Sequence, residues 1–250
     1  MEYNYDETGW KAYKAGTVIK VERGYEVAFR STTTIKAWNG GNKIYCYAPT
    51  SNKDERDGCF SVGGNIASLI VGDDFVSGGA SVTGWSFLDF FKGHKHMIDA
   101  SELILPMLKC EENCYKSMFD SCTDLVHGPS ELPATTMAKT CYRNMFYNCS
   151  SLVEAPYIAT ETTTADCFQR MFAGCSSLRL IKLNAREYKA KAYQADKEVN
   201  WVNGVNPEGE IWINPAITGT ANWEKIIPRD VSAGWEWQIK TLPNGDPWSY

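Results

Sequence analysis

A pattern of twelve residues occurs three times in the middle of the chain, and it constrains the fold more than any other feature. The pattern is Cys-aromatic-x-x-Met-Phe-x-x-Cys-x-x-Leu, and its copies begin at Cys114, Cys141 and Cys167. These starts lie 27 and 26 residues apart. A unit of this length cannot bury its apolar side chains alone, so it must stack on its neighbours. The sequence therefore predicts a solenoid.

The spacing inside the pattern predicts a short helix. Cys114, Met118, Cys122 and Leu125 are separated by 4, 4 and 3 residues, a spacing that keeps them on one helical face. An irregular return with Leu132 to Thr136 follows. We therefore expect an α+β fold, a leucine-rich-repeat solenoid of short helix-turn-strand repeats with a β-rich N-terminal cap and a degenerate C-terminal cap.

Weaker copies of the pattern extend the repeat region in both directions. Phe90-Phe91 occupies the Met-Phe position upstream, and Trp201-Val202 occupies it downstream. The predicted repeats are 86–113, 114–140, 141–166 and 167–196, with a terminal half-repeat at 197–205. The predicted domains are a β-rich cap at 1–75, the solenoid at 76–205 and a C-terminal capping segment at 206–250.

Alternating apolar residues predict β-strands in both flanks. The expected strands are 17–21, 26–30, 43–47, 66–71 and 210–213, with a turn at 39–42. Residues 185–197 are rich in helix formers and predict a helix with a polar face. Three tryptophans are expected to close the C-terminal end of the core: Trp223, Trp235 and Trp237.

The repeat motif resembles that of BspA-like leucine-rich repeats, which occur in surface and secreted proteins of gut bacteria and in proteins of their phages. The resemblance rests on the Met-Phe-x-x-Cys-x-x-Leu segments and on the Leu-Pro-Ala-Thr-Thr return at 132–136. It covers about 75–205 and extends more weakly to both ends. It implies adhesion or recognition rather than catalysis.

The chain has nine cysteines, an odd number that argues against a fully paired disulfide framework. We expect the repeat cysteines to be reduced and buried, since free cysteine is among the most buried residue types. A metal site at His94, His96, Cys110 and Cys114 is the alternative, although zinc sites favour tighter Cys pairs. We expect neither a metal nor a cofactor.

Charge and composition narrow the class of partner. With 25 basic and 30 acidic residues the net charge is −5, which disfavours nucleic acid as a partner. No apolar stretch reaches the roughly 18 residues of a membrane helix. The acidic N-terminus does not resemble a secretory signal, so the chain is made for the cytoplasm, exported without that signal, or shown without it.

No residue set indicates catalysis. A glycosidase needs two carboxylates that face one cleft, and Asp73, Asp74 and Asp89 are candidates only because they are acidic. No nucleophile motif or phosphate-binding glycine loop is present. We therefore expect a non-enzymatic protein with no catalytic residues.

Binding is the expected activity, and five residues are weak candidates for contact with a partner: Trp38, Lys116, Arg143, Tyr147 and Asn148. The expected role is a phage virion component, such as a fibre, decoration or attachment protein, displayed as an oligomer. Its partners would be a protein or glycan on a host surface, or other virion proteins. A bacterial surface or secreted adhesin is the alternative, and a glycan-degrading enzyme is a third hypothesis.

Overall fold

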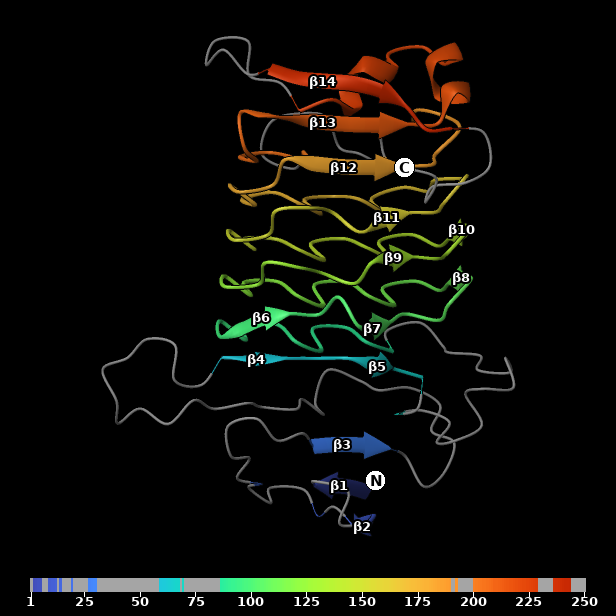
Figure 1. The fold of residues 1–250 in the computed structure, drawn as a ribbon. Helices are drawn as coiled ribbons and strands as arrows, with labels where there is room; N and C mark the ends of the chain where they lie inside the picture. The colour runs from blue at the N-terminus through green and yellow to red at the C-terminus, as the bar shows by residue number, and fades with distance from the viewer. Residues whose placement is uncertain are drawn as a thin grey trace.

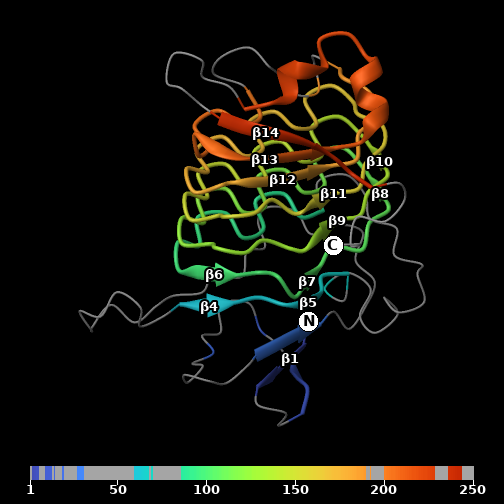
Figure 2. The same cartoon turned by 45° about the horizontal axis from the view of Figure 1, so that its top comes forward.

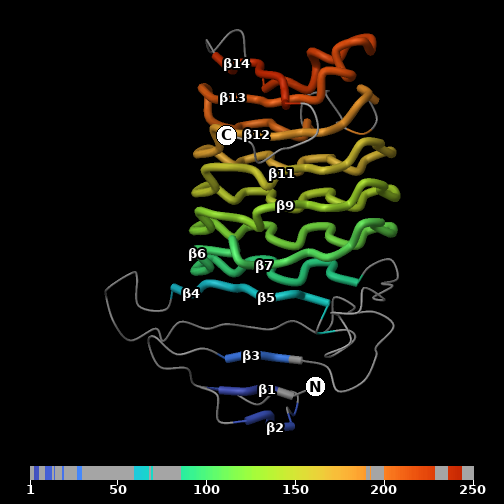
Figure 3. The backbone as a smooth tube through the Cα atoms, turned by 45° about the vertical axis from the view of Figure 1, so that its right-hand side comes forward, coloured from blue at the N-terminus to red at the C-terminus, as the bar shows by residue number. Residues whose placement is uncertain are grey.

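In a computed structural model the chain forms a β-solenoid of about four turns, with very little helix (Figure 1). The structure describes residues 2–5, 9–12, 14, 19, 27–30, 59–67, 69, 86–189, 192, 200–228 and 236–243. Successive coils of the backbone lie on top of one another in chain order (Figure 3). The solenoid expected from the repeat is therefore confirmed.

Short parallel strands define one face of the solenoid. The strands β9 (Glu131–Leu132), β11 (Tyr157–Ile158), β12 (Leu180–Leu183), β13 (Glu208–Ile213) and β14 (Glu236–Thr241) form a five-stranded sheet with neighbours one coil apart. Single bridges between Asp99, His127, Glu154 and Leu180 extend this ladder across the coils. Figure 2 shows these strands on one side of the coil.

Shorter strand pairs continue the stack at the corner and toward the N-terminus. The corner pair is β8 (Lys109–Cys110) with β10 (Thr136–Met137). The first coil contributes β4 (Phe60–Ser61) and β5 (Gly64–Asn65), which pair in parallel with β6 (Met97–Asp99) and β7 (Leu103–Ile104). Among the described residues, parallel stacking of the solenoid thus begins at Phe60.

The predicted helix in each repeat is wrong, because the twelve-residue pattern forms a ladder of turns. In the first copy, alternate backbone N–H groups bond to the carbonyl three residues earlier, as Met118 does to Tyr115. The N–H groups between them bond to the next coil, as Phe119 does to Met145 at 2.8 Å. Apart from Leu69 and Ala192, no described residue is α-helical.

Residues with positive φ make this turn ladder possible. They recur every four residues in each copy, at 113, 117 and 121, at 140, 144 and 148, and at 166, 170 and 174. A positive φ reverses the local direction of the backbone. Two side chains then point inward and the next two point outward, so the segment does not coil into a helix. Because Asn, Asp and Gly tolerate this conformation best, five of the nine positions carry one of these residues.

Two columns of aromatic rings fill the interior of the solenoid. One runs from Phe91 through Phe119 and Phe146 to Phe172, with ring centroids 5.5, 5.1 and 5.6 Å apart and nearly parallel planes. The other column consists of Phe87, Tyr115, Tyr142 and Phe168. Both columns meet Trp201, which is fully buried. Identical residues at one position of each coil therefore stack directly.

The cysteines of the three copies are free thiols buried in the core, as expected. The second cysteine of each copy donates its S–H to the carbonyl of a phenylalanine in the preceding coil. Cys122 bonds to Phe91 at 3.1 Å, and Cys149 bonds to Phe119 at 3.0 Å. Cysteine at this position thus packs as a small apolar residue and also satisfies a backbone carbonyl that faces the core.

An antiparallel sheet lies at the N-terminal end of the stack (Figure 1). It comprises β1 (Glu2–Tyr5), β2 (Lys11–Ala12) and β3 (Val27–Arg30), in the order β2-β1-β3. The C-terminal end carries the 3-10 helices η3 (Pro215–Gly219) and η4 (Trp223–Ile226) beside β14. Among the residues described, no helix has the length and hydropathy of a membrane span.

The strands predicted in the flanks have mixed outcomes. Those at 26–30 and 210–213 are confirmed by β3 and β13. The strand at 66–71 is wrong in its described part, since Ile66 and Ala67 lie in a turn and Leu69 is helical. The predictions at 39–42 and 43–47 lie outside the described residues, as do Trp235, most of 17–21 and much of the helix at 185–197. Within that last range the described residues 185–189 are not helical, whereas Ala192 is.

Candidate binding recess on the turn ladder

The outward side chains of the turn ladder form columns, because each coil is in register with the next. Ser117 donates its backbone N–H to Arg143, and Asn144 donates to Gln169. These bonds align Lys116, Arg143 and Gln169, the third residue of each copy, in one row. All three side chains are half-buried, so the row lies on the surface without projecting from it.

Two of the predicted contact residues line a recess on this face. The recess measures about 410 Å³, and it is lined by Tyr147, Asn148, Arg170, Ala173, Gly174, Asn203 and Gly204. Lys116 and Arg143 are not among the lining residues, and Trp38 lies outside the described residues. Arg170, Asn203 and Gly204 were not singled out from the sequence.

The recess exists because the outward pair of residues becomes small toward the C-terminal end. The pair is Asp120-Ser121 in the first copy and Tyr147-Asn148 in the second, and then Ala173-Gly174 in the third. Gly174 donates its N–H to the carbonyl of Asn203, which brings Asn203-Gly204 into the same columns. Gly174 and Gly204 occupy the same position in successive coils. Because neither has a side chain, space remains beside the Tyr147 ring. The decrease in side-chain size from Tyr147-Asn148 to Ala173-Gly174 is the sequence feature that could have located the recess.

Polar groups dominate the lining of the recess. Asn148 and Asn203 are exposed amides, Tyr147 presents a half-buried ring, and Arg170 contributes the one formal charge among the seven lining residues. None of these seven carries a carboxylate, an imidazole or a thiol. The lining instead offers a phenol, two amides and a guanidinium.

Three buried polar atoms of the turn ladder have no hydrogen-bond partner within the described residues. They are Nε of Arg143, Oδ1 of Asn144 and Oε1 of Gln169. Asn144 donates its backbone N–H to the carbonyl of Gln169 on the next coil, so the three residues occupy neighbouring positions of the ladder.

Of the four residues weighed as a metal site, Cys110 and Cys114 are hydrogen-bonded to each other, but the two histidines lie elsewhere. His94 packs edge-on against Phe60 and Phe91, whereas His96 lies 3.6 Å from Asp124 on the surface. The sulfur of Cys110 lies 3.6 Å from the Tyr142 hydroxyl in the core. Within the described part of the chain, no three His, Cys, Asp or Glu side chains are placed to hold a metal ion.

Three of the buried thiols are poorly suited to nucleophilic chemistry. Burial raises the pKa of Cys122 to about 12 and that of Cys167 to about 12, and it raises the pKa of Cys149 well above its usual value. A thiol is nucleophilic only as the thiolate. Cys110 differs, because burial raises its pKa but hydrogen bonds with Cys114, Cys141 and Tyr142 outweigh that effect and hold the pKa well below its usual value.

Three carboxylates, including one of the glycosidase candidates, are paired with neighbouring lysines. Lys92 lies 3.9 Å from Asp89 and 2.8 Å from Asp120, and Lys240 lies 2.7 Å from Glu210. Asp120 is nearly buried, whereas Asp89 and Glu210 are partly exposed. Asp73 and Asp74 lie outside the described residues.

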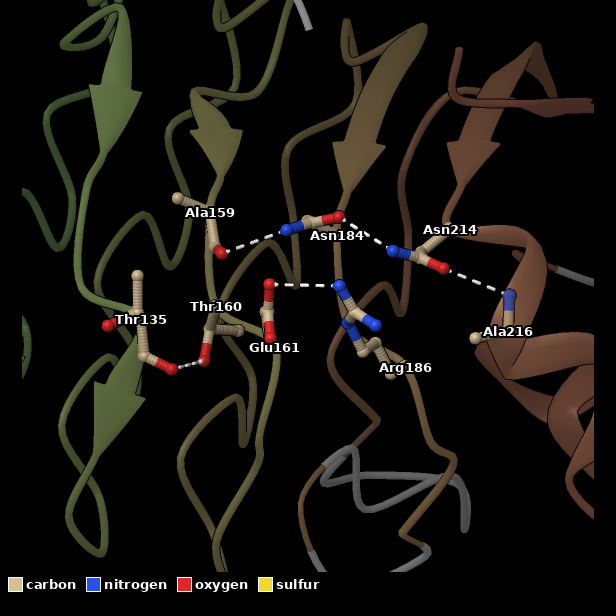
Figure 4. Close-up of polar contacts among 8 residues, drawn as sticks. All are labelled: Thr135, Ala159, Thr160, Glu161, Asn184, Arg186, Asn214 and Ala216. Atoms are coloured by element: carbon tan, nitrogen blue, oxygen red, sulfur yellow. Dashed lines mark hydrogen bonds and ion pairs between the residues drawn. The ribbon is translucent and has the colours of Figure 1, made fainter. Parts of the chain in front are cut away.

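A second polar cluster occupies the corner that follows the sheet, and it links coils rather than forming a site. The Asn184 amide donates to the Ala159 carbonyl at 3.2 Å, and Asn214 donates to Oδ1 of Asn184 at 2.8 Å (Figure 4). Oδ1 of Asn214 in turn accepts from the N–H of Ala216. Because its donors and acceptors bond to one another, this corner has a structural role.

Comparison with known proteins adds no relative: no family model, no curated protein and no solved structure matches the chain.

Proposed function

We propose that this protein is a non-enzymatic recognition module, carried by a phage virion as a fibre, decoration or attachment protein. It would contact a protein or glycan on the host surface, or other virion proteins. One observation carries the proposal: a constant interior supports outward positions that differ from coil to coil. Asp120, Tyr147 and Ala173 directly follow the stacked rings of Phe119, Phe146 and Phe172, and Asn203 continues the same column after Val202. Tyr147 and Asn203 are accessible to solvent, whereas Asp120 and Ala173 are nearly buried.

The chemistry of the surface supports binding. The recess beside Tyr147 offers an aromatic ring, two amides and a guanidinium, which are groups common in binding sites. Its lining lacks an acid–base pair. The resemblance of the repeat motif to BspA-like surface proteins points in the same direction.

The size of the solenoid favours display in several copies. About four turns provide a limited contact area for a partner. Linked copies convert weak single contacts into firm attachment, because later contacts form at a high effective concentration. We therefore propose an oligomer or a repeated lattice as the working state.

The proposal is tested by locating the protein and by assaying hydrolysis. Gold-labelled antibodies against the purified protein should decorate virus particles from a lysate of cells that carry the gene. The same protein should leave host-surface glycans uncleaved. Label confined to the bacterial surface would favour the adhesin instead. Glycan hydrolysis that disappears when one carboxylate is replaced would contradict a non-enzymatic role.

A further inference from the structure

We infer that Cys110 and Cys114 form an oxidisable pair in the core, which a peroxide converts into a disulfide. Both thiols are free, and their residues are only 1% and 0% exposed. They lie at the corner where β8 leads into the turn ladder, and not on the outward columns of side chains. The pair is therefore independent of the proposed recognition function.

The fold gathers thiols at this corner because two interior columns meet there. Cys110 pairs with Met137 on the next coil. Four residues after Cys110, the first cysteine of the pattern, Cys114, lies in register with Cys141, whose carbonyl accepts from the N–H of Tyr115. The sulfur of Cys110 is hydrogen-bonded both to Cys114 of its own coil and to Cys141 of the next. Three thiols thus meet around one sulfur atom.

The surroundings of Cys110 favour its ionised form. Its sulfur also lies 3.6 Å from the hydroxyl of Tyr142, with which it is hydrogen-bonded. Burial and the carboxylate of Glu111 raise the pKa of Cys110, but the hydrogen bonds with Cys114, Cys141 and Tyr142 outweigh them and hold it well below its usual value. The hydrogen bond with Cys110 raises the pKa of Cys114. One thiol therefore ionises readily while its neighbour keeps its proton.

The reaction consumes one peroxide for each disulfide. The thiolate of Cys110 attacks one oxygen of hydrogen peroxide, the O–O bond breaks, and hydroxide leaves, which gives a sulfenic acid. The sulfur of Cys114 then displaces the hydroxyl group of that acid, and the S–S bond forms. The protons of both thiols end on the two hydroxides, so the products are one disulfide and two molecules of water. Two electrons pass from the sulfurs to the peroxide.

Three other buried cysteines are held differently. Cys122, Cys149 and Cys175, the second cysteine of each copy, donate their S–H groups to backbone carbonyls at 3.1, 3.0 and 3.0 Å. Burial raises the pKa of Cys122 to about 12, so this thiol keeps its proton. Because only the thiolate reacts with peroxide, these three cysteines should stay reduced while Cys110 and Cys114 are oxidised.

The test treats the folded full chain with hydrogen peroxide, removes the peroxide with catalase, and then unfolds the protein in N-ethylmaleimide to block every remaining thiol. Trypsin releases Cys110 and Cys114 on one peptide, 110–116, and Cys141 on another, 140–143. Mass spectrometry should show that the peptide with both thiols has lost two hydrogens and carries no label. The peptides that contain Cys122 and Cys175 should be fully labelled.

Two conservative variants test the hydroxyl that supports the thiolate. Tyr142→Phe removes a hydrogen bond to Cys110, so disulfide formation should reach half its maximal rate at a higher pH than in the wild type. Tyr115→Phe is the matched control, because Tyr115 holds the same position one coil earlier and is not hydrogen-bonded to Cys110. Its pH profile should match that of the wild type. Phe168 occupies this position in the next coil, so both variants should fold.

Four results would overturn the inference. Full labelling of peptide 110–116, while the partly exposed Cys59 is oxidised, would show that peroxide does not act on this pair. A crosslink between peptides 110–116 and 140–143 would make Cys141 the partner instead of Cys114. Oxidation of Cys122 at the same rate would remove the selectivity for the corner. Coincident pH profiles for Tyr142→Phe and Tyr115→Phe would contradict the stabilised thiolate.

Discussion

At the scale of single residues, the left-handed positions decide whether this chain forms a solenoid. Ten described residues other than glycine have positive φ, and they include Thr140, whose β-branched side chain resists this conformation. Each costs about 1–2 kcal/mol relative to an ordinary conformation. Hydrogen bonds between coils offset this cost, because the turn leaves alternate N–H groups pointing along the solenoid axis.

Gly174 should be more sensitive to substitution than Gly204. Both have positive φ, so alanine strains the backbone at either position. At Gly174 the new Cβ would also overlap Oδ1 of Asn148. We expect Gly174→Ala to lower the free energy of unfolding by about 1 kcal/mol more than Gly204→Ala does, in urea denaturation. Equal losses would mean that the Asn148 side chain turns away at no cost.

Because of the buried thiols, the free energy of unfolding should fall as the pH rises into the alkaline range. Burial raises the pKa of Cys149 well above the roughly 8.5 of an unfolded cysteine. The native state therefore keeps a proton that the unfolded state loses, and the stabilisation falls as pH rises above about 8.5. The stability advantage of the wild type over Cys149→Ala should shrink by about 1.4 kcal/mol per pH unit there.

Denaturant titrations at several pH values would measure this change. Leu152→Ala is the matched control, because Leu152 is fully buried in the same coil and does not titrate. Its cost should stay constant over the same pH range. A parallel decline in both variants would show that other groups cause the alkaline loss.

At the scale of elements, the aromatic columns bind the coils together. The ring of Phe146 stacks on Phe119 at 5.1 Å and on Phe172 at 5.6 Å, and it is fully buried. Phe146→Ala should therefore cost about 3–5 kcal/mol, the usual loss for a buried phenylalanine. Thermal and urea unfolding would measure it.

Tyr147 provides a control from the same turn of the ladder. Its ring faces outward and is half-buried, so Tyr147→Ala should change stability by only about 0.5 kcal/mol. A loss below about 1 kcal/mol for Phe146→Ala would contradict the role of the columns.

At the scale of the whole molecule, the coils behave as units that contact only their neighbours. Deletion of residues 141–166 removes one coil of 26 residues and joins Thr140 to Cys167, so Phe172 takes the place of Phe146 above Phe119. We expect this shortened chain to fold, with a lower melting temperature. Size-exclusion chromatography and thermal unfolding would test this.

Deletion of residues 141–153 removes only half a coil and is the appropriate contrast. It would place Cys167 out of register with the cysteine and aromatic columns, so this variant should not fold. Cooperative folding of both deletions, or of neither, would argue against independent stacking of coils.

The sequence by itself determined the length of the coil, the interior columns and the buried thiols. Phe119, Phe146 and Phe172 recur at nearly constant spacing, and identical residues at a constant period must stack when units repeat. The position of Tyr147 and Asn148 on the outer surface followed from the same alignment, since they lie between the inward residues. These features depend on periodicity alone.

Only the tertiary structure decided between a helix and a ladder of turns. Two inward residues followed by two outward ones repeat every four residues, close to the helical period of 3.6, so the apolar pattern fits both. The difference lies in the N–H groups of residues such as Phe119, which bond to Met145 on the next coil. These hydrogen bonds join residues 26 positions apart in the sequence. The spacing of apolar residues within one repeat therefore does not reveal them.

The recess was likewise decided by the tertiary structure. Tyr147, Arg170 and Asn203 come from three successive coils, and their side chains meet only when those coils stack in register. Sequence reasoning found Tyr147 and Asn148 because they vary at an outward position. It missed Arg170 and Asn203. The space between these two residues exists because Gly174 and Gly204 have no side chains, and this becomes visible only when the coils are stacked.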